Sequence, residues 1–140
     1  MKARHLAALT LATILLLSVA ACALPGLPTG DPLKGTSWHL VMLGDASLVP
    51  GTEITAAFED GQVHGSACNS YGGSYQVSGD KLTVRDLFMT EMACVEPQGI
   101  MEQERQYLEM LGMGKTFRLS GGQLQIFASG GELLTFVPAP

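Results

Sequence analysis

Basic side chains are scarce in this sequence of 140 residues. Lysine and arginine number eight against thirteen aspartates and glutamates, which gives a formal net charge of −5. Those outside the N-terminal segment are scattered along the chain, at Lys34, Lys81, Arg85, Arg105, Lys115 and Arg118. Because Lys and Arg contacts to phosphate supply most of the affinity for nucleic acids, we do not expect this protein to bind DNA or RNA.

The sequence also lacks the common catalytic and cofactor motifs. It contains no Gly-x-Ser-x-Gly elbow, no Gly-x-x-x-x-Gly-Lys phosphate loop and no His-Glu-x-x-His zinc motif. Its neighbouring carboxylates are expected at solvent-exposed positions rather than as a catalytic acid–base pair. Glu59 and Asp60 fall in an expected turn, and Glu102, Glu104 and Glu109 are expected on the solvated face of a helix. We therefore expect neither enzyme activity nor a cofactor.

Cysteine is rare as well, and the first of the three cysteines ends a distinctive N-terminal segment. Lys2 and Arg4 precede an apolar stretch over residues 6–21, and Cys22 follows directly. This is the layout of a secretory signal. The stretch has 16 residues, fewer than the roughly 20 that span a bilayer as a helix.

Val19-Ala20-Ala21-Cys22 resembles a bacterial lipobox. The resemblance implies cleavage before Cys22 and attachment of lipid to its sulfur, and two or three acyl chains would hold the protein firmly to a membrane. The alternatives are an ordinary secretory signal cut near Ala20 and Ala21, or an uncleaved membrane anchor. The expected location is the cell envelope, either at the outer membrane facing the periplasm or at the outer leaflet of the cytoplasmic membrane.

Removal of residues 1–21 as a signal peptide would leave a chain with two parts. Residues 22–32 are rich in Pro and Gly and are expected to form a tether. Residues 33–138 suffice for one domain with its own core but not for two. This exported form would carry six basic and thirteen acidic side chains, a net charge of −7.

Short alternating segments with glycine-rich turns fill most of the body. They predict strands over residues 36–43, 53–58, 62–66, 74–77, 81–84, 116–119, 123–127 and 132–137. Asp60-Gly61 suits a tight hairpin turn. Asn69 with the paired Gly72 and Gly73 permits tight or left-handed backbone between two strands. The pattern indicates an α+β fold, mainly an antiparallel, curved or barrel-like meander of about seven or eight strands.

Residues 97–111 break this pattern. Apolar residues recur with the spacing of one helix face, at Ile100, Met101, Tyr107, Leu108 and Leu111. Pro97 suits the first helical turn and Gly112 the C-terminal cap. We expect one amphipathic helix near residues 97–111, packed on the sheet by this face.

Several ordered blocks carry a more specific resemblance. Gly35-Thr-Ser-Trp38 opens the body, Gly65 to Tyr75 lies in its middle, Thr90-Glu-Met-Ala-Cys94 follows, and Met101-Glu-Gln-Glu104 and Leu124-x-Ile-Phe127 complete the pattern. Together they resemble the META domain family, which includes heat-shock-inducible lipoproteins of the HslJ type. The matching positions are Gly35, Thr36, Trp38, Gly65, Cys68, Asn69, Tyr71, Gly73, Tyr75, Thr90, Met92, Ala93 and Cys94. The resemblance covers Leu33 to about Val137 and implies a small β-rich fold with one helix, residence in the envelope, and no established catalytic residues.

Two of these positions, Cys68 and Cys94, suit a disulfide. A bridge between them is the expected state in an oxidising envelope, and closing a loop of this length contributes roughly 3–4 kcal/mol in the loop-entropy model. A reactive thiol or a metal site is the alternative, because His39 and His64 add ligand types for zinc or copper. No Cys-x-x-Cys or tight histidine pair supports a metal.

The two tyrosines of the middle block, Tyr71 and Tyr75, are expected on one face of a strand. Their rings would fill the core, and each hydroxyl would need a polar partner. Thr90 is a plausible partner if the two cysteines are joined.

The expected function is that of a non-catalytic envelope lipoprotein that contacts a protein or a small ligand. A role in stress or drug tolerance is implied by the family resemblance alone. One alternative is a barrel-like binder of a small hydrophobic molecule. Another is an inhibitor-like module that offers a loop, such as residues 44–51, to an envelope hydrolase.

Overall fold

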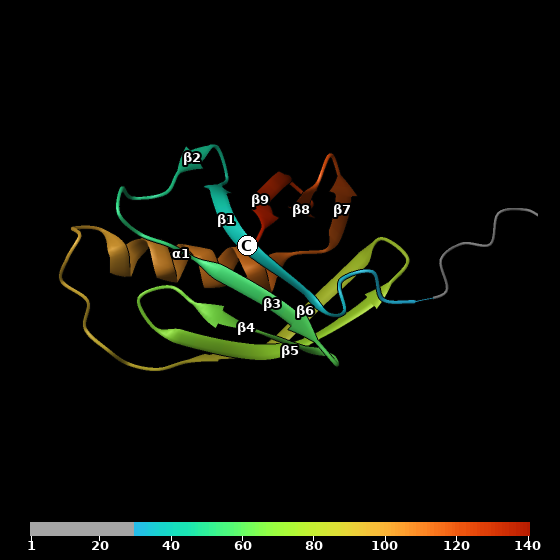
Figure 1. Ribbon diagram of the computed structural model, residues 1–140, viewed down its shortest axis with the longest axis horizontal. Helices are drawn as coiled ribbons and strands as arrows, with labels where there is room; N and C mark the ends of the chain where they lie inside the picture. The colour runs from blue at the N-terminus through green and yellow to red at the C-terminus, as the bar shows by residue number, and fades with distance from the viewer. Residues whose placement is uncertain (1–29) are drawn as a thin grey trace, which may run out of the picture.

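Nine strands and one helix make up the part of the chain that the computed structural model describes, residues 30–140 (Figure 1). The predicted signal peptide, Cys22 and most of the predicted tether lie outside the described residues. The strands are β1 (Thr36–Leu43), β2 (Ala46–Ser47), β3 (Thr55–Glu59), β4 (Gln62–Ser66), β5 (Ser70–Ser78), β6 (Lys81–Met89), β7 (Thr116–Ser120), β8 (Gln123–Ala128) and β9 (Gly131–Pro138). The helix α1 (Ile100–Met113) lies between β6 and β7 in the chain. Residues 30–140 contain no helix long and apolar enough to cross a membrane.

The strands form one antiparallel sheet that closes on itself. Neighbours in the sheet follow the order β2-β1-β3-β4-β5-β6-β7-β8-β9, and β1 also pairs with β9. The weakest seam is between β6 and β7, which share a single residue pair, Lys81 with Thr116. These features confirm the prediction of a mainly antiparallel, barrel-like meander with one helix.

The local patterns explain most of the register. Asp60 and Gly61 both have positive φ, 46° and 79°, as a tight hairpin between β3 and β4 requires. In β1 the pairing with β9 shifts between Leu40 and Met42. The shift turns Leu43 to the interior beside Trp38 and Leu40, and ends the strict alternation expected over this strand.

The predicted turn around the paired glycines is wrong. Gly72 and Gly73 lie inside β5, which runs from Ser70 to Ser78. Asn69 is not left-handed either, because Asp60 and Asp86 are the only described non-glycine residues with positive φ. A Cβ at Gly72 would lie 2.7 Å from the ring of Phe88, and one at Gly73 would lie 2.8 Å from the carbonyl oxygen of Arg85. The glycines therefore allow close approach between β5 and β6 rather than a turn.

In Figure 1 the helix crosses the middle of the view, with β7–β9 above it and β3–β6 below it. It begins at Ile100, three residues later than predicted, because Gly99 is left-handed with a φ of 93°. It ends at Met113, and the N–H of Gly114 donates to the carbonyl of Leu111. The helix packs against β9 and against β6, the strand that shares only one residue pair with β7.

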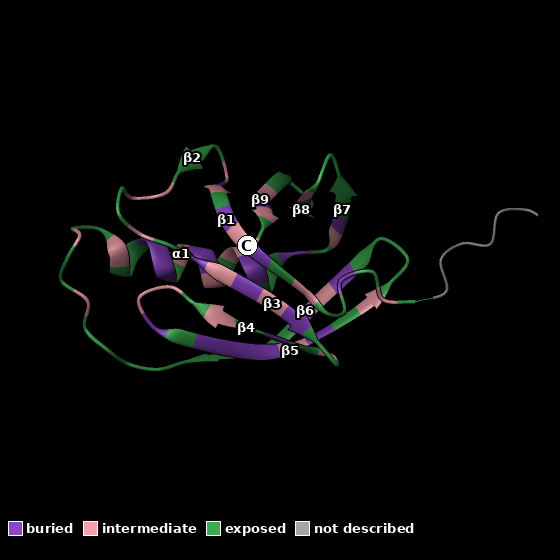
Figure 2. Cartoon of the chain, in the orientation of Figure 1, coloured by how far each residue is buried: buried purple, intermediate pink, exposed green. Residues whose placement is uncertain are grey.

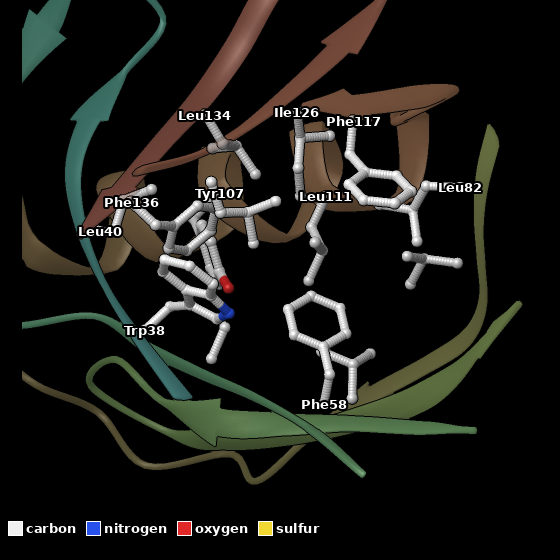
Figure 3. Close-up of a cluster of buried hydrophobic side chains, with 14 of the residues drawn as sticks. Trp38, Leu40, Phe58, Leu82, Tyr107, Leu111, Phe117, Ile126, Leu134 and Phe136 are labelled. Carbon is white, nitrogen blue, oxygen red and sulfur yellow. The ribbon is translucent and has the colours of Figure 1, made fainter. Parts of the chain in front are cut away.

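Side chains from the helix and from every strand except β2 fill the interior (Figures 2 and 3). Tyr107 and Leu111 of α1 are fully buried and point into the cluster. The ring of Tyr107 meets those of Tyr71 and Phe136 edge to face, at centroid distances of 5.4 and 6.4 Å. The helix is therefore part of the core rather than a cover over it.

We predict that Leu111→Ala lowers the free energy of unfolding by about 2–5 kcal/mol, because the leucine is fully buried between helix and sheet. Urea unfolding followed by Trp38 fluorescence measures this. The control is Leu119→Ala at a leucine that is 42% exposed on β7, where a change within about 0.5 kcal/mol is expected. Equal losses for the two variants would contradict the placement of the helix in the core.

Candidate functional site

Two of the family-specific sequence blocks, residues 65–75 and residues 90–94, meet at one end of the molecule. Cys68, in the loop between β4 and β5, forms a disulfide with Cys94, in the segment between β6 and α1. The predicted bridge is confirmed, and it leaves neither sulfur as a thiolate for a metal. Within residues 30–140, no group of three or more His, Cys, Asp or Glu side chains is placed to hold a metal ion.

Asn69 is the centre of this meeting point. Its side chain is fully buried. The Oδ1 atom accepts hydrogen bonds from the Thr90 hydroxyl and the Met92 N–H, at 2.8 and 2.7 Å. The Nδ2 group donates to the Glu104 carboxylate at 2.8 Å and to the Met92 carbonyl at 3.3 Å. We call Asn69, Thr90, Met92, Glu104 and the Cys68–Cys94 disulfide the Asn69 junction.

Glu104 brings the helix into the junction. Its two carboxylate oxygens accept from the backbone N–H and the side-chain amide of Asn69, at 2.6 and 2.8 Å. The side chain is only 1% exposed, so its expected place on a solvated helix face is wrong. A sequence signal for this burial exists, because Glu104 falls at helical spacing between Ile100 and Tyr107, inside the apolar stripe.

Met101, one helical turn before Arg105, adds a contact that the sequence did not indicate. It was expected in the buried stripe, but it is 40% exposed. Its thioether sulfur lies 3.6 Å from the sulfur of Cys68 and accepts the N–H of Cys94 at 3.4 Å. Met101 therefore packs on the disulfide from the outside.

The tyrosine hydroxyls have partners other than the expected one. Tyr71 donates to the carbonyl of Thr55 at 2.7 Å, and its oxygen lies 2.5 Å from that of Tyr107, which is thus the donor of that pair. The hydroxyl of Thr90 instead donates to Asn69. A Cβ at Gly65 would lie 2.0 Å from the Thr55 oxygen. Glycine at this position therefore permits the contact between Thr55 and Tyr71.

Burial shifts the titration of these phenols. Desolvation raises the pKa of Tyr71 and that of Tyr107 well above their usual range. Burial, together with a hydrogen bond to the carboxylate of Asp31, also raises the pKa of Tyr75. All three tyrosines of the chain therefore ionise less readily in the folded protein than a free tyrosine does, which ionises near pH 10.

The first block serves a different part of the molecule, the entry of the chain into β1. Gly35 has a φ of 75°, and its N–H donates to the carbonyl of Phe58 at 2.7 Å. The hydroxyl of Thr36 donates to the carbonyl of Leu33 at 2.5 Å and accepts from the indole N–H of Trp38 at 2.7 Å. These residues position Trp38 in the core.

The predicted site residues thus fall into two groups. The structure brings Cys68, Asn69, Thr90, Met92 and Cys94 together at the junction, whereas Gly35, Thr36, Trp38, Gly65, Tyr71, Gly73 and Tyr75 organise the core and the strands. Met92 and its neighbour Ala93 are exposed. Both carboxylate oxygens of Glu104 are already hydrogen-bonded within the junction. These hydrogen bonds and the disulfide hold the β4–β5 loop and the β6–α1 segment together.

The sequence comparison that decides the family spans the whole described body. The sequence model of the META domain family matches residues 31–140. The chain belongs to the META domain family. Heat shock protein HslJ of Escherichia coli strain K12 is 35% identical to it over 74 residues. The match takes in 53% of this chain and 51% of HslJ, so the chain spans about half the length of this curated relative.

Solved structures show the same fold as this META domain. An NMR structure of a protein has a TM-score of 0.61 and 26% identity, with coverage of 76% of this chain and 91% of its own. An NMR structure of a protein from Burkholderia xenovorans has a TM-score of 0.60 and 31% identity, with coverage of 76% and 83%. A crystal structure of a DUF4847 family protein from Bacteroides vulgatus, 14% identical with a TM-score of 0.56, covers 76% of this chain and 94% of its own and shares the fold alone.

We predict that Glu104→Gln destabilises this META domain by about 1–3 kcal/mol. Glutamine can accept from one Asn69 N–H but places its own NH₂ against the other donor, which leaves a buried polar group unsatisfied. Urea unfolding measures the loss, and hydrogen exchange of the Asn69 and Met92 amides should accelerate. Glu109→Gln, at an exposed glutamate of the same helix paired with Arg105, is the control and should change stability by less than about 0.5 kcal/mol.

A second prediction concerns alkaline pH. In the unfolded chain tyrosine ionises near pH 10, whereas burial keeps Tyr71 and Tyr107 neutral beyond that pH in the folded state. Above pH 10 the unfolded state therefore binds fewer protons, and stability falls by up to about 1.4 kcal/mol per pH unit for each buried tyrosine.

Absorbance of tyrosinate at alkaline pH, recorded together with Trp38 fluorescence, tests this prediction. The two signals should change together, because the phenols ionise as the domain unfolds. Ionisation of all tyrosines near pH 10 with unchanged Trp38 emission would show that the hydroxyls are not buried as described.

Proposed function

We propose that this protein is a non-catalytic lipoprotein of the cell envelope that is held by acyl chains on Cys22 and supports the cell under heat or drug stress through contacts with another protein. The observation that carries the proposal is the Cys68–Cys94 disulfide, found in a chain whose N-terminal segment has the layout of a lipoprotein signal. Disulfides persist in oxidising compartments outside the cytoplasm. The stress role is supported by the similarity to HslJ, whose name states that it is a heat shock protein.

The start of the described chain indicates which end of the domain would lie nearest an anchor at Cys22. Leu33 is fully buried, and the carboxylate of Asp31 accepts hydrogen bonds from the Leu33 N–H and the Tyr75 hydroxyl. The chain is thus firmly attached to the domain from Asp31 onward. Eight residues separate Cys22 from Asp31, so an anchor at Cys22 would hold the end of the molecule that carries Asp31 nearest the membrane.

The site favours contact over catalysis. The junction groups are hydrogen-bonded to one another or joined in a disulfide, and two shallow surface grooves of about 470 Å³ each are lined largely by polar residues of β5 and β6. No observation favours the hydrophobic-ligand or inhibitor alternatives over protein contact.

We predict that Cys22→Ser releases the protein from membranes. The wild-type protein should fractionate with membranes and yield an N-terminal lipopeptide by mass spectrometry, whereas the variant should lack the lipid. Thr13→Ser, which changes the apolar stretch but not the four residues ending at Cys22, is the control. A soluble wild-type protein with an unmodified Cys22 would refute the anchor.

The same variants address the stress role. In a strain of the native organism that lacks the gene, the wild-type protein should restore survival after heat or drug exposure, and the Cys22→Ser protein at equal abundance should restore less. A deletion strain with normal survival under every stress applied would refute the proposed role and leave the anchor unaffected.

A further inference from the structure

Exposed apolar side chains gather at the end of the molecule that carries the Asn69 junction. The described residues expose eight large apolar side chains, and five of them lie between Phe88 and Met101. We call four of these the distal patch: Met89 (42% exposed), Met92 (57%), Val95 (79%) and Met101 (40%). Phe88 is not included, because it alternates with Met89 on β6 and pairs with Gly72, and so lies on the other face of the sheet. The remaining three are on three different elements, Val41 on β1, Met113 at the end of α1 and Leu119 on β7. Clustering of this kind is typical of interaction sites.

The segment that carries the patch is held in place although residues 90–99 form neither helix nor strand. The N–H of Thr90 donates to the carbonyl of Ser70 at 3.0 Å. Asn69 binds both the N–H and the carbonyl of Met92, and Cys94 is held by the disulfide. The backbone is thus fixed while the side chains of Met92 and Val95 face solvent. Preorganisation of this kind lowers the entropy cost of binding a partner.

The charge around the patch has one sign. Glu91 and Glu96 are exposed beside it, and no lysine or arginine occurs between Arg85 and Arg105. Arg105 pairs with Glu102 and Glu109 on its own helix, at 2.6 and 3.1 Å. The patch is therefore apolar with an acidic margin, which complements an apolar segment that carries Lys or Arg. A second copy of this chain or an anionic lipid surface would instead set like charges together.

The patch lies opposite the start of the described chain. In Figure 1 the described chain begins, in blue, on the right of the molecule, and the loop between β6 and α1 lies on the left. Figure 2 shows that loop mostly in the colour of exposed residues. With the anchor of the proposed function, the patch would point away from the membrane.

We propose that the distal patch is the docking surface for an apolar, basic segment of an envelope protein, such as an amphipathic helix with Lys or Arg beside its apolar face. Methionine side chains suit such a surface because they are flexible and polarisable and adapt to differently shaped apolar partners. The proposal deepens the proposed function, on which it rests for the location and orientation of the protein. The binding chemistry rests on the patch alone.

The binding test uses the protein as cells process it. If the purified protein carries lipid, it is studied in phosphatidylcholine nanodiscs; if it carries none, it is studied in buffer. The probe is a fluorescent 14-residue peptide of leucine and lysine with its leucines on one helical face. Fluorescence anisotropy should show binding that weakens as salt is added. The same peptide with glutamate in place of lysine should bind at least tenfold more weakly. Equal binding of the two peptides would overturn the proposal.

Two pairs of variants locate the binding. Met92→Ser with Val95→Ser should weaken binding about tenfold or more, since two apolar contacts are lost, and Leu119→Ser should leave it unchanged. Glu91→Lys with Glu96→Lys should also weaken binding several-fold and reduce its salt dependence, whereas the same charge change at Glu53 and Glu59 should have a smaller effect. All substituted residues are exposed, and thermal unfolding checks that the variants fold. Equal effects in either pair would overturn the proposal.

Crosslinking in cells tests the occupant. A photoreactive amino acid is placed at position 95 of the full chain, with position 119 as the control, and the crosslinked segment is sequenced by mass spectrometry. Capture of an apolar segment that carries Lys or Arg, at position 95 only, supports the proposal. Capture of lipid, of a second copy, of an acidic segment or of nothing overturns it.

The two proposals fail separately. If Cys22 carries no lipid but the leucine-lysine peptide and the crosslink behave as expected, the anchor fails and the docking surface stands. If Cys22 is lipidated and the patch variants bind the peptide as well as the wild type does, the docking surface fails and the anchor stands.

Discussion

The rest of the junction depends on the pairing of the Glu104 carboxylate with Asn69. A carboxylate that is almost fully buried must have its oxygens hydrogen-bonded, or the cost of removing it from water is not offset. Among residues 30–140, both oxygens of Glu104 are satisfied by Asn69 and by no cation. Asn69 can hold this geometry because Thr90 and Met92 occupy its remaining groups. One polar contact thus fixes the helix, the β4–β5 loop and the β6–α1 segment relative to one another, and the disulfide adds a covalent link between two of them.

The burial of Glu104 follows from how the sheet closes. β6 and β7 share a single residue pair, so the ring is incomplete along most of β6, and α1 packs against β6 and β9. A helix in that position turns Tyr107 and Leu111 into the core. Glu104 lies one turn before Tyr107 on the same face and so enters the interior with it. The polar junction is therefore a result of placing a helix beside an open seam. Asn69 offsets the cost of burying the Glu104 carboxylate, because it donates a hydrogen bond to each carboxylate oxygen.

Much of this fold could be predicted from local patterns, and the exceptions share a cause. Alternating residues located eight strands, and Asp60-Gly61 located a hairpin, because those signals depend on the local chain alone. Gly72 and Gly73 suggested a turn, but their role is set by Phe88 and Arg85 on the neighbouring strand. Glu104 had the periodicity of a core residue and the chemistry of a surface residue, and only its contact with Asn69 decides between them. At both of these positions a partner distant in the sequence determines the outcome.

The distribution of apolar surface bears on what the junction is for. Stability alone would require only that the β6–α1 connection be short and polar. Instead, a ten-residue segment is fixed by a disulfide, by Asn69 and by Thr90, while Met92 and Val95 remain in solvent. Exposed apolar side chains on a rigid support add nothing to the core and increase the risk of aggregation. Their presence is understood if the junction holds a contact surface, because the disulfide and the hydrogen bonds then order that surface before any partner arrives.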